Sequence, residues 1–492
     1  MRDQLLHIEP RSGISLQAQI REMLVSGILD GIIPPGEPIP SSRNLANSLG
    51  VARNTVMLAY QQMVEEGYLI SRQRSGYFVN KDILVGRVNK ANTQGSEPQK
   101  HNIKPDWESL IQVKPSQQRS ILKNQRWQEY PYPFIYGQLD PAQFPINDWR
   151  ESSRQALSPV AIREWANDSI DSDDPKLIEQ IRTRVLPRRG VMVQSDQILI
   201  TLGAQQAIYL LAQLLVGRKD TVGIEDPGYP DARNIFELIT KEVVGLTVDK
   251  EGVMVDTILD RCKLLFITPS HQFPTTVTMS LDRRKELLKS AAEYGFIIIE
   301  DDYECETNFL DNPTPSLKSL DTGESVVYIG SLSKTLAPGL RIGYMVGSPE
   351  LIKEARALRR LIIRHPPANN QRAVAYFLAQ GHHDSLVRRL SHGYKDRWEV
   401  MGEALDRHFP NSFLVPSFGG TSYWIRGVDE LNTRKLAAAA EARGILFEHG
   451  DICFLSDPPP RNFFRLGFSS IAVTQIETGV RLLSETIDEL LS

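Results

Sequence analysis

The stretch Ile297-Ile298-Ile299-Glu300-Asp301-Asp302-Tyr303 decides the fold of most of this chain. Three isoleucines that run directly into acidic residues predict a strand that is buried on both faces and ends at a polar site. Similar apolar runs occupy residues 197–201, 221–225, 264–268, 296–300 and 326–330, and helical patterns occupy 205–216, 231–240 and 281–294. This alternation predicts a mainly parallel sheet with helices on both faces, whose polar strand ends face a crevice.

The length and composition limit the possible classes of protein. The 492 residues are about three times a typical domain length, which predicts two or more folded units. Hydrophobic residues make up 41% of the chain without an apolar run of about 18 residues, so we expect a soluble protein with no membrane span. Met1-Arg2-Asp3-Gln4 is not followed by an apolar run, so we expect no secretory signal.

The cysteine content also limits the possible classes of protein. Three cysteines in the whole chain are too few and too irregular for a disulfide framework, and none has the spacing of a zinc ligand. We therefore expect a reducing cytoplasm as the location and no metal site.

The composition changes between residues 81 and 130, where Lys, Arg, Gln, Asn and Pro recur with few apolar residues. Because this stretch is long for a loop within one domain, it predicts a linker at 81–130 between a domain at 1–80 and a large domain at 131–492. Residues 1–80 hold 7 basic and 7 acidic side chains, and the linker holds 9 and 5. The net charge of -4 thus belongs to the large domain and does not exclude nucleic acid as a partner of the first.

The first domain has the pattern of three short helices followed by a hairpin. Apolar residues at every fourth position from Leu16 to Ile28 predict one helix, a serine within Pro40-Ser41-Ser42-Arg43 caps a second that ends at Gly50, and residues 52–66 predict a third. Two strand-like runs then flank an arginine-bearing turn. This order predicts a winged helix-turn-helix, whose recognition helix places its first residues in the major groove of DNA.

Candidate DNA contacts follow from this geometry. Arginine and asparagine pair with guanine and adenine edges, and polar residues at a helix start or on a wing suit the phosphate backbone or the minor groove. The candidates are Ser41, Ser42, Arg43, Arg53, Asn54, Thr55, Arg72 and Arg74. By charge alone they are equally compatible with a solvated surface, because the domain is neutral.

The pattern as a whole is more specific. The runs Gly36-Glu37-Pro38-Ile39-Pro40-Ser41-Ser42-Arg43, Arg53-Asn54-Thr55-Val56 and Gly76-Tyr77-Phe78-Val79 resemble the winged helix of GntR-type bacterial regulators. The resemblance implies that this domain binds operator DNA.

In the large domain, a lysine follows one of the predicted strands in Ser331-Leu332-Ser333-Lys334, with Arg341 close behind. A lysine at a buried strand end is costly unless it is neutralised, and Schiff-base formation with an aldehyde is one way to do so. The two serine hydroxyls and the guanidinium supply the donors that a phosphate requires.

Other strand ends carry matching groups. Asp301 is able to keep a pyridinium nitrogen protonated, and Tyr303 to reach a phenolic ring oxygen. Backbone amides at residues 203–205, where a strand gives way to a helix, are able to cradle a phosphate, and Tyr229 to stack on a flat ring. Taken singly, each group has an ordinary alternative as an exposed lysine, a capping aspartate, a core tyrosine or a turn glycine.

In this order the groups resemble the fold-type-I aminotransferases that use pyridoxal 5′-phosphate, from about Tyr136 to the C-terminus. The resemblance implies a smaller C-terminal α+β subdomain, a Schiff base at Lys334 and a carboxylate clamp at Arg465 that binds the effector. It implies cofactor contacts from Gly203, Ala204, Gln205, Tyr229, Asp301, Tyr303, Ser331, Ser333 and Arg341.

A GntR-like winged helix joined to an aminotransferase-like domain resembles the MocR-type regulators, which include the GabR proteins. The resemblance implies a transcription factor that binds an amine or amino acid as an external aldimine and works as a homodimer, domain-swapped head to tail. GABA, taurine and diamino acids from ectoine breakdown all suit such a site. Activation and repression both remain open.

One departure bears on catalysis. Phe273 stands where many such enzymes have an asparagine that bonds the ring hydroxyl. This favours sensing over turnover, but it leaves open the alternative of an active aminotransferase that carries a DNA-binding domain, or a slow transaminase half-reaction. An oxidoreductase that binds a dinucleotide is disfavoured because the glycine fingerprint after the first strand is missing.

Overall fold

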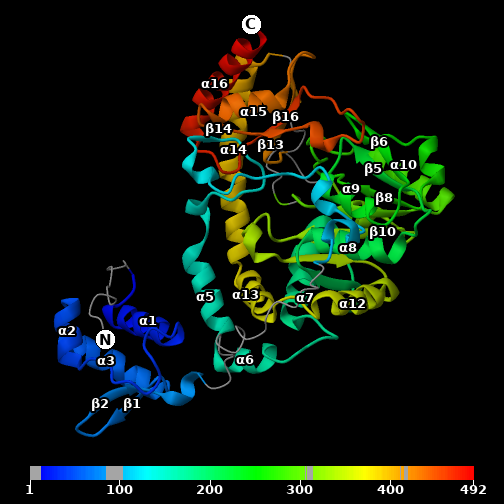
Figure 1. Cartoon of the computed structure of the whole chain (residues 1–492). Helices are drawn as coiled ribbons and strands as arrows, with labels where there is room; N and C mark the ends of the chain where they lie inside the picture. Colours follow the sequence, from blue (N-terminus) through cyan, green and yellow to red (C-terminus); the bar gives the residue numbers. More distant parts are fainter. Residues whose placement is uncertain (1–12, 85–103, 305, 307–313, 411, 415–418) are drawn as a thin grey trace. The chain divides into compact units, whose positions relative to one another are not determined.

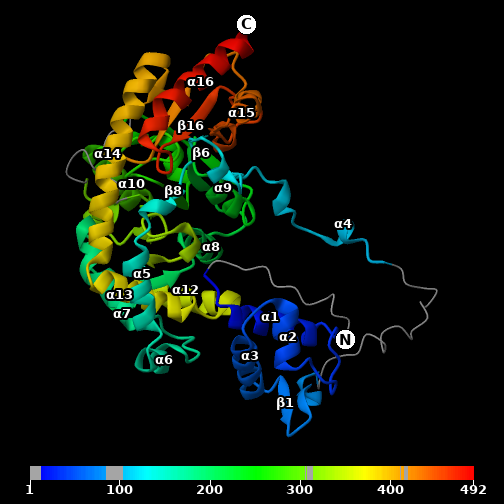
Figure 2. The same cartoon turned by 90° about the vertical axis from the view of Figure 1, so that its left-hand side faces the viewer.

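The computed structural model describes every residue of the chain except 1–12, 85–103, 305, 307–313, 411 and 415–418. The chain divides into two units, residues 1–110 and 111–492. Figures 1 and 2 show the small unit in blue and the large unit in cyan to red. The linker predicted at 81–130 stays a prediction, and the division between the units falls within it.

The described residues of the small unit form four α-helices and a hairpin: α1 (Leu16–Leu29), α2 (Ser42–Leu49), α3 (Arg53–Glu65), β1 (Leu69–Arg72), β2 (Gly76–Val79) and the short α4 (Trp107–Leu110). The predicted stripe of α1 is its buried face, since Ile20, Leu24 and Ile28 are fully buried in one core with side chains of α3. Ser41 caps α2 by accepting a hydrogen bond from the backbone N–H of Asn44 at 3.2 Å. The predicted winged helix-turn-helix is therefore confirmed.

An eight-stranded sheet forms the centre of the large unit, in the order β4-β11-β10-β9-β8-β5-β6-β7. From β10 to β6 neighbouring strands run parallel, whereas β11 is antiparallel to both of its neighbours and β7 is antiparallel to β6. The strands are β4 (Ile198–Thr201), β5 (Val222–Asp226), β6 (Val243–Asp249), β7 (Gly252–Val253), β8 (Leu264–Ile267), β9 (Ile297–Asp301), β10 (Val326–Ser331) and β11 (Gly343–Val346). The mainly parallel sheet predicted from the sequence is confirmed.

Helices cover both faces of this sheet. Neighbouring residues of a strand point to opposite faces, and Ile298 and Ile299 of β9 accordingly belong to two different clusters of buried side chains. Ile299 packs with α8 (Ala204–Leu215), α9 (Pro230–Glu237) and α12 (Pro349–Ile363), and Ile298 packs with α10 (Leu281–Tyr294). The isoleucine run is continuous because both of its faces are buried.

The C-terminal part of the chain forms the predicted smaller α+β subdomain. Its antiparallel sheet has the order β12-β13-β16-β15, made by β12 (Phe413–Leu414), β13 (Ser422–Arg426), β15 (Glu448–His449) and β16 (Phe463–Gly467). The helices α15 (Thr433–Glu441) and α16 (Val473–Leu491) belong to it, and α16 lies beside the long α14 (His382–His408) in Figures 1 and 2. A separate two-stranded pairing joins β14 (Ile445–Leu446) to β3 (Tyr132–Pro133).

The remaining helices of the large unit are α5 (Ile146–Ala156), α6 (Pro159–Trp165), α7 (Pro175–Gln180), α11 (Leu317–Leu320) and α13 (Ala368–Ala379). Within the described part of the chain, no helix is both long enough and apolar enough to cross a membrane.

The segment 111–130 packs against the rest of the large unit, although it has little regular structure. The backbone carbonyl of Arg119 accepts hydrogen bonds from Asn234 at 2.9 Å and from the guanidinium of a neighbouring arginine. The ammonium of Lys123 donates to the carbonyl oxygen of Tyr136 at 2.6 Å. This segment therefore contributes side chains to the structure of the large unit.

Candidate functional site

A cavity of about 310 Å³ lies at the carboxyl ends of the parallel strands. Parallel strands end at the same edge of a sheet, so the segments that follow β4, β5, β8, β9 and β10 converge here. The cavity is lined by all the residues predicted to bind the cofactor: Gly203, Ala204, Gln205, Tyr229, Asp301, Tyr303, Ser331, Ser333, Lys334 and Arg341.

Lys334 follows the end of β10 and lines this cavity. Its Nζ lies 4.3 Å from the centroid of the Tyr136 ring. Gly137 has a φ of +68°, and a Cβ added there would lie 2.7 Å from the same Nζ, so glycine leaves the room that the amine occupies. Burial, followed by repulsion from Lys123, lowers the pKa of Lys334 to about 8. The neutral amine, which is the nucleophilic form, is thus easier to reach than for an exposed lysine.

Asp301 is the last residue of β9 and is 4% exposed. Its Oδ1 atom is buried and has no hydrogen-bond partner among the described residues. Burial, followed by repulsion from Asp302, raises the pKa of Asp301 to about 7, and Lys334 opposes this shift. Buried polar atoms are normally paired, so this oxygen is a site that a buried N–H donor would satisfy.

Aromatic rings line the cavity between these polar groups. The centroid of the Phe273 ring lies 5.3 Å from that of Tyr229, 6.0 Å from that of Tyr136 and 6.4 Å from that of Tyr303, all edge to face. Phe273 is 4% exposed and occupies the centre of this group. It offers no hydrogen bond to a ring hydroxyl, because its side chain has neither donor nor acceptor.

One end of the cavity is built from the start of α8. Gly203 caps this helix with a φ of +77°, and the first backbone N–H groups of any helix lack partners within it. A Cβ added at Gly203 would lie 3.2 Å from the guanidinium of Arg341, which donates to the carbonyl oxygen of Leu202 at 2.8 Å. Helix-start amides beside a guanidinium form an anion-binding site.

Ser331 and Ser333, which precede Lys334, differ in the hydrogen bonds that their hydroxyls make. The hydroxyl of Ser333 accepts from the N–H of Ile342 at 3.1 Å and donates to the carbonyl of the same residue at 3.2 Å. The hydroxyl of Ser331 accepts from the N–H of Ser333 at 3.3 Å. The proton of Ser331 is thus the better placed of the two to reach a ligand.

The donor set fits pyridoxal 5′-phosphate. The lining combines an anion site, a buried carboxylate oxygen that has no donor among the described residues, aromatic rings and an amine of lowered pKa. These correspond in kind to the phosphate, the ring nitrogen, the flat ring and the aldehyde of that cofactor.

Arg465, the predicted effector contact, does not line the cavity. It lies on β16, 3% exposed, with its guanidinium carbon 4.0 Å from the centroid of Tyr136 and 4.2 Å from that of Phe273. Its Nε donates to Glu448 at 2.9 Å, and the two residues lie opposite each other in the β15–β16 register. Both rings line the cavity, so Arg465 contacts the cavity wall from behind. Its role toward an effector stays a prediction.

Lys123, Tyr136 and Thr268 also line the cavity and were not predicted. Two of them carried a signal, since Tyr136 begins the aminotransferase-like region and Thr268 ends a predicted strand. Lys123 carried none, because it lies in a polar segment without periodicity.

The predicted DNA contacts divide between the start of α2, the start of α3 and the wing. Arg53 and Asn54 are exposed at the first residues of α3, and the Nε of Arg53 donates to the hydroxyl of Ser42 at 3.4 Å. Thr55 is half-buried, and Arg43 is exposed on α2. The recognition position therefore presents its arginine and asparagine to solvent.

The wing holds the other two arginines. The guanidinium carbon of Arg72 lies 4.4 Å from the centroid of the Phe78 ring on the paired strand. Arg74 is exposed in the turn with a φ of +60°. The DNA roles of all these residues stay predictions.

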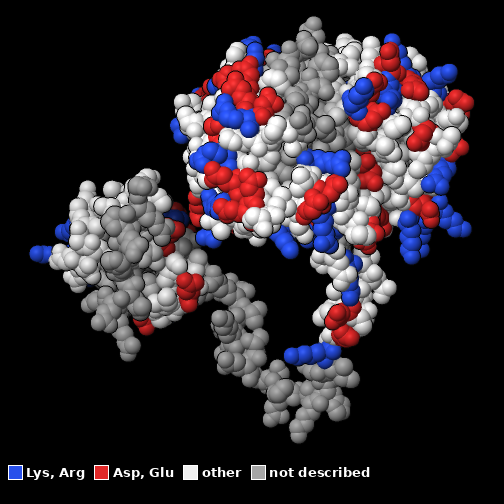
Figure 3. Space-filling model, turned by 90° about the horizontal axis from the view of Figure 1, so that it is seen from above, with Lys and Arg blue, Asp and Glu red and all other residues white. Residues whose placement is uncertain are grey.

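The surface charge of the large unit does not mark a candidate DNA-binding face. On the face shown in Figure 3, its basic and acidic side chains alternate in small groups. The candidate DNA surface is therefore identified by the winged helix rather than by charge.

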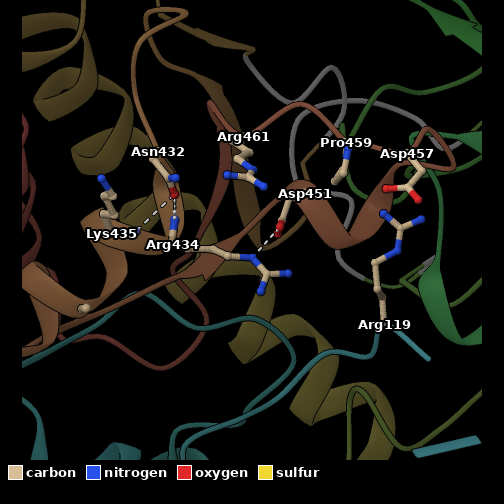
Figure 4. A pocket seen from close by; sticks show the side chains of 9 residues that line it. Arg119, Asn432, Arg434, Lys435, Asp451, Asp457, Pro459 and Arg461 are labelled. Atoms are coloured by element: carbon tan, nitrogen blue, oxygen red, sulfur yellow. Dashed lines mark hydrogen bonds and ion pairs between the residues drawn. The ribbon is translucent and has the colours of Figure 1, made fainter. Parts of the chain in front are cut away.

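A larger cavity of about 660 Å³ lies near the start of α15 and contains none of the predicted residues. Figure 4 shows its charged lining, in which Arg434 pairs with Asp451 at 2.6 Å. The lining residues are Arg119, Asn432, Arg434, Lys435, Ala438, Asp451, Asp457, Pro459 and Arg461. It lacks an aromatic platform and a buried amine, so the smaller cavity is the candidate site.

Comparison with known proteins agrees with this division. Residues 16–79 match the family of bacterial regulatory proteins called gntR, and residues 137–481 match aminotransferase class I and II. The large unit is similar to kynurenine aminotransferase of Pyrococcus horikoshii, solved in complex with PMP. That similarity has a TM-score of 0.71 at 27% identity and covers 79% of this chain and 99% of that one.

Two relatives share the full organisation. The HTH-type transcriptional regulator TauR of Rhodobacter capsulatus is 39% identical over 96% of each chain. The probable rhizopine catabolism regulatory protein MocR of Rhizobium meliloti is 28% identical over 97% of this chain and 95% of its own. The chain therefore belongs to the MocR-type regulators, in which a GntR-type winged helix-turn-helix domain is joined to a domain of aminotransferase class I and II.

Proposed function

We propose that this protein is a transcriptional regulator that binds operator DNA with its winged helix and senses an amine or amino acid through pyridoxal 5′-phosphate in the cavity. The observation that carries the proposal is the assembly of Lys334, Asp301 and the Gly203 helix start in one cavity of a chain that also has a recognition helix. A primary amine is the ligand class because the bound cofactor supplies an aldehyde that condenses with amines.

Each residue has a role in holding the cofactor. Asp301, whose Oδ1 has no partner among the described residues, would hold the ring nitrogen and keep it protonated. The backbone amides at residues 203–205, with Ser331, Ser333 and Arg341, would hold the phosphate. Tyr229 and Tyr303 position the ring, and Lys334 supplies the amine that attaches to it.

With the cofactor bound, an effector amine would compete with Lys334 for its aldehyde. The Nζ of Lys334 lies beside the Tyr136 ring and, like the Nζ of Lys123, close to Gly137. A ligand shifts a protein between two conformations only if it binds them unequally. Lys334 would supply such a difference, because it would be attached to the cofactor without an effector and free with one.

On the DNA side, Arg53, Asn54 and Thr55 read base edges, and Ser41, Ser42 and Arg43 contact phosphates. Arg72 and Arg74 of the wing reach the backbone or the minor groove. The protein acts in the cytoplasm as a homodimer, domain-swapped head to tail, so that two winged helices read repeated half-sites.

The second candidate function is an aminotransferase that carries a DNA-binding domain. Phe273 argues against efficient turnover, because a phenyl ring cannot bond the ring hydroxyl. The test mixes cofactor-loaded protein with an amine and a keto acid and measures keto product. Less than one product per site, together with a changed cofactor spectrum, is expected of a sensor; sustained multiple turnovers would overturn this assignment.

A further inference from the structure

Two neighbouring apolar side chains are exposed on α3, the predicted recognition helix. Met57 is 42% exposed and Leu58 is 47% exposed. The opposite face of the same helix supplies the core of the small unit and buries Val56, Ala59, Tyr60 and Met63. Single exposed apolar residues are common on protein surfaces, but these two lie on the face of α3 that is predicted to meet DNA.

Met57 shares one edge of this face with Arg53. Side chains four residues apart lie above each other on a helix, so Met57 follows Arg53 by one turn and Leu58 follows Asn54. The Nε of Arg53 donates to the hydroxyl of Ser42 at 3.4 Å, at the start of α2. Because Ser42 is a predicted phosphate contact, the edge that carries Arg53 and Met57 is the one beside the predicted phosphate contacts. Leu58 lies about 100° further around the helix than Met57.

The chemistry of methionine limits what Met57 is able to recognise in DNA. Its thioether has no hydrogen-bond donor and is only a weak acceptor, so it cannot read the polar edges of base pairs. Thymine presents an apolar group in the major groove, its C5-methyl, where the other bases present hydrogen-bonding atoms. The unbranched side chain has three rotatable bonds and adapts to the position of such a group. An exposed methionine beside a base-reading arginine therefore fits a thymine.

We propose that Met57 contacts the C5-methyl group of a thymine in the operator, close to the base that Arg53 reads. The proposal rests on the proposed function, because it requires α3 to enter the major groove of DNA. The rise of about 1.5 Å per residue separates Met57 from Arg53 by about 6 Å along the helix, close to two base steps of about 3.4 Å. The contacted thymine is thus within about two base pairs of the Arg53 contact.

The experiment measures how a single methyl group of the DNA changes the affinity of the full-length protein. The probe is a duplex that the wild-type protein selects from a pool of random sequences. Each thymine of this duplex is replaced in turn by deoxyuridine, which removes the methyl group and keeps the base pairing. Burial of one methylene-sized group changes an equilibrium constant about fourfold, so we expect the wild-type Kd to rise about three- to fivefold at the contacted thymine.

Two variants identify the side chain that makes the contact. Met57→Gln replaces the apolar end by an amide of similar length, and glutamine is a good helix former, so α3 should stay folded. Leu58→Gln is the matched control, because it makes the same kind of change at an equally exposed neighbour on the other edge. We expect Met57→Gln to bind the thymine and deoxyuridine duplexes almost equally, and Leu58→Gln to keep the wild-type ratio. Titrations at low salt keep weakened variants measurable.

The outcomes separate this assignment from the proposed function. If the wild type discriminates at a thymine where Met57→Gln does not and Leu58→Gln does, the assignment holds. If no deoxyuridine changes the wild-type affinity, or if Met57→Gln still discriminates or Leu58→Gln fails equally, Met57 is not the methyl contact and the DNA-binding proposal stands. If no duplex is selected over unrelated DNA, both proposals fail.

A second copy of this chain is the other occupant that an apolar face of α3 could have. Analytical ultracentrifugation of Met57→Gln and the wild type without DNA tests it. We expect the same oligomeric state for both proteins. A change in the variant would make Met57 a contact between copies and would overturn the assignment.

Discussion

Replacing Arg465 with methionine should destabilise the large unit, because it leaves the Glu448 carboxylate buried without its cation. Both side chains are nearly inaccessible, at 4% and 10% exposure, and the Oε1 atom of Glu448 already lacks a partner among the described residues. Removing one member of a buried ion pair costs about 3–5 kcal/mol, because the remaining charge stays desolvated. Methionine keeps most of the apolar contact with the rings of Tyr136 and Phe273.

A double variant combines Arg465→Met with Glu448→Leu. Replacing both charges by apolar side chains of similar size is often close to neutral, so this double variant should unfold at a higher urea concentration than Arg465→Met alone. Trp424 lies opposite Arg465 in the β13–β16 register and stacks on Phe463 at 5.6 Å, so its fluorescence reports on this region. Arg154→Met, which breaks an exposed pair with Glu151, is the control.

Either of two results would contradict this prediction. Equal free energies of unfolding for Arg465→Met and the double variant would mean that the unpaired Glu448 charge is not the cause. A free energy of unfolding of Arg465→Met within about 0.5 kcal/mol of the wild-type value, the range of ordinary surface substitutions, would also contradict the prediction.

Three further predictions concern the cofactor and DNA. Lys334→Ala should lose the visible absorption band of the bound cofactor, and a retained band would locate the attachment elsewhere. Uptake of pyridoxal 5′-phosphate by the apoprotein should accelerate as pH rises through about 8, because the pKa of Lys334 is about 8 and the neutral amine reacts; a rise centred near pH 10.5, the ordinary lysine value, would contradict this. Arg53→Ala should weaken specific operator binding by about 1–3 kcal/mol, as measured by gel shift, while binding to unrelated DNA changes little; unchanged operator affinity would reject a base contact.

Much of the fold followed from local patterns. The isoleucine run of β9 predicted a doubly covered strand, since no other position in a sheet tolerates three consecutive apolar residues that alternate between faces. Asp301 and Lys334 were predicted to meet because the ends of parallel strands converge, and both line one cavity. The winged helix followed from the apolar spacing of α1 and the caps of α2.

The remaining parts of the site depend on contacts between distant segments. The pairing of Arg465 with Glu448 is set by the register of β15 and β16, which the sequence of these short strands does not specify. Lys123 reaches the cavity because the polar segment around it packs on the large unit through backbone groups, which leave no periodicity in the sequence. The aromatic cover over Arg465 likewise requires Tyr136 and Phe273 to meet from separate parts of the chain.

The central claim is that an amine bound at the Lys334 cofactor controls the DNA-binding unit. The most direct measurement follows operator affinity by fluorescence anisotropy and the cofactor spectrum in the same amine titration, for the wild type and for Lys334→Ala. Operator affinity of the wild type should change by about 5- to 150-fold over the amine range that changes the spectrum, and Lys334→Ala should show neither change. An operator affinity that stays constant while the wild-type spectrum changes would contradict it.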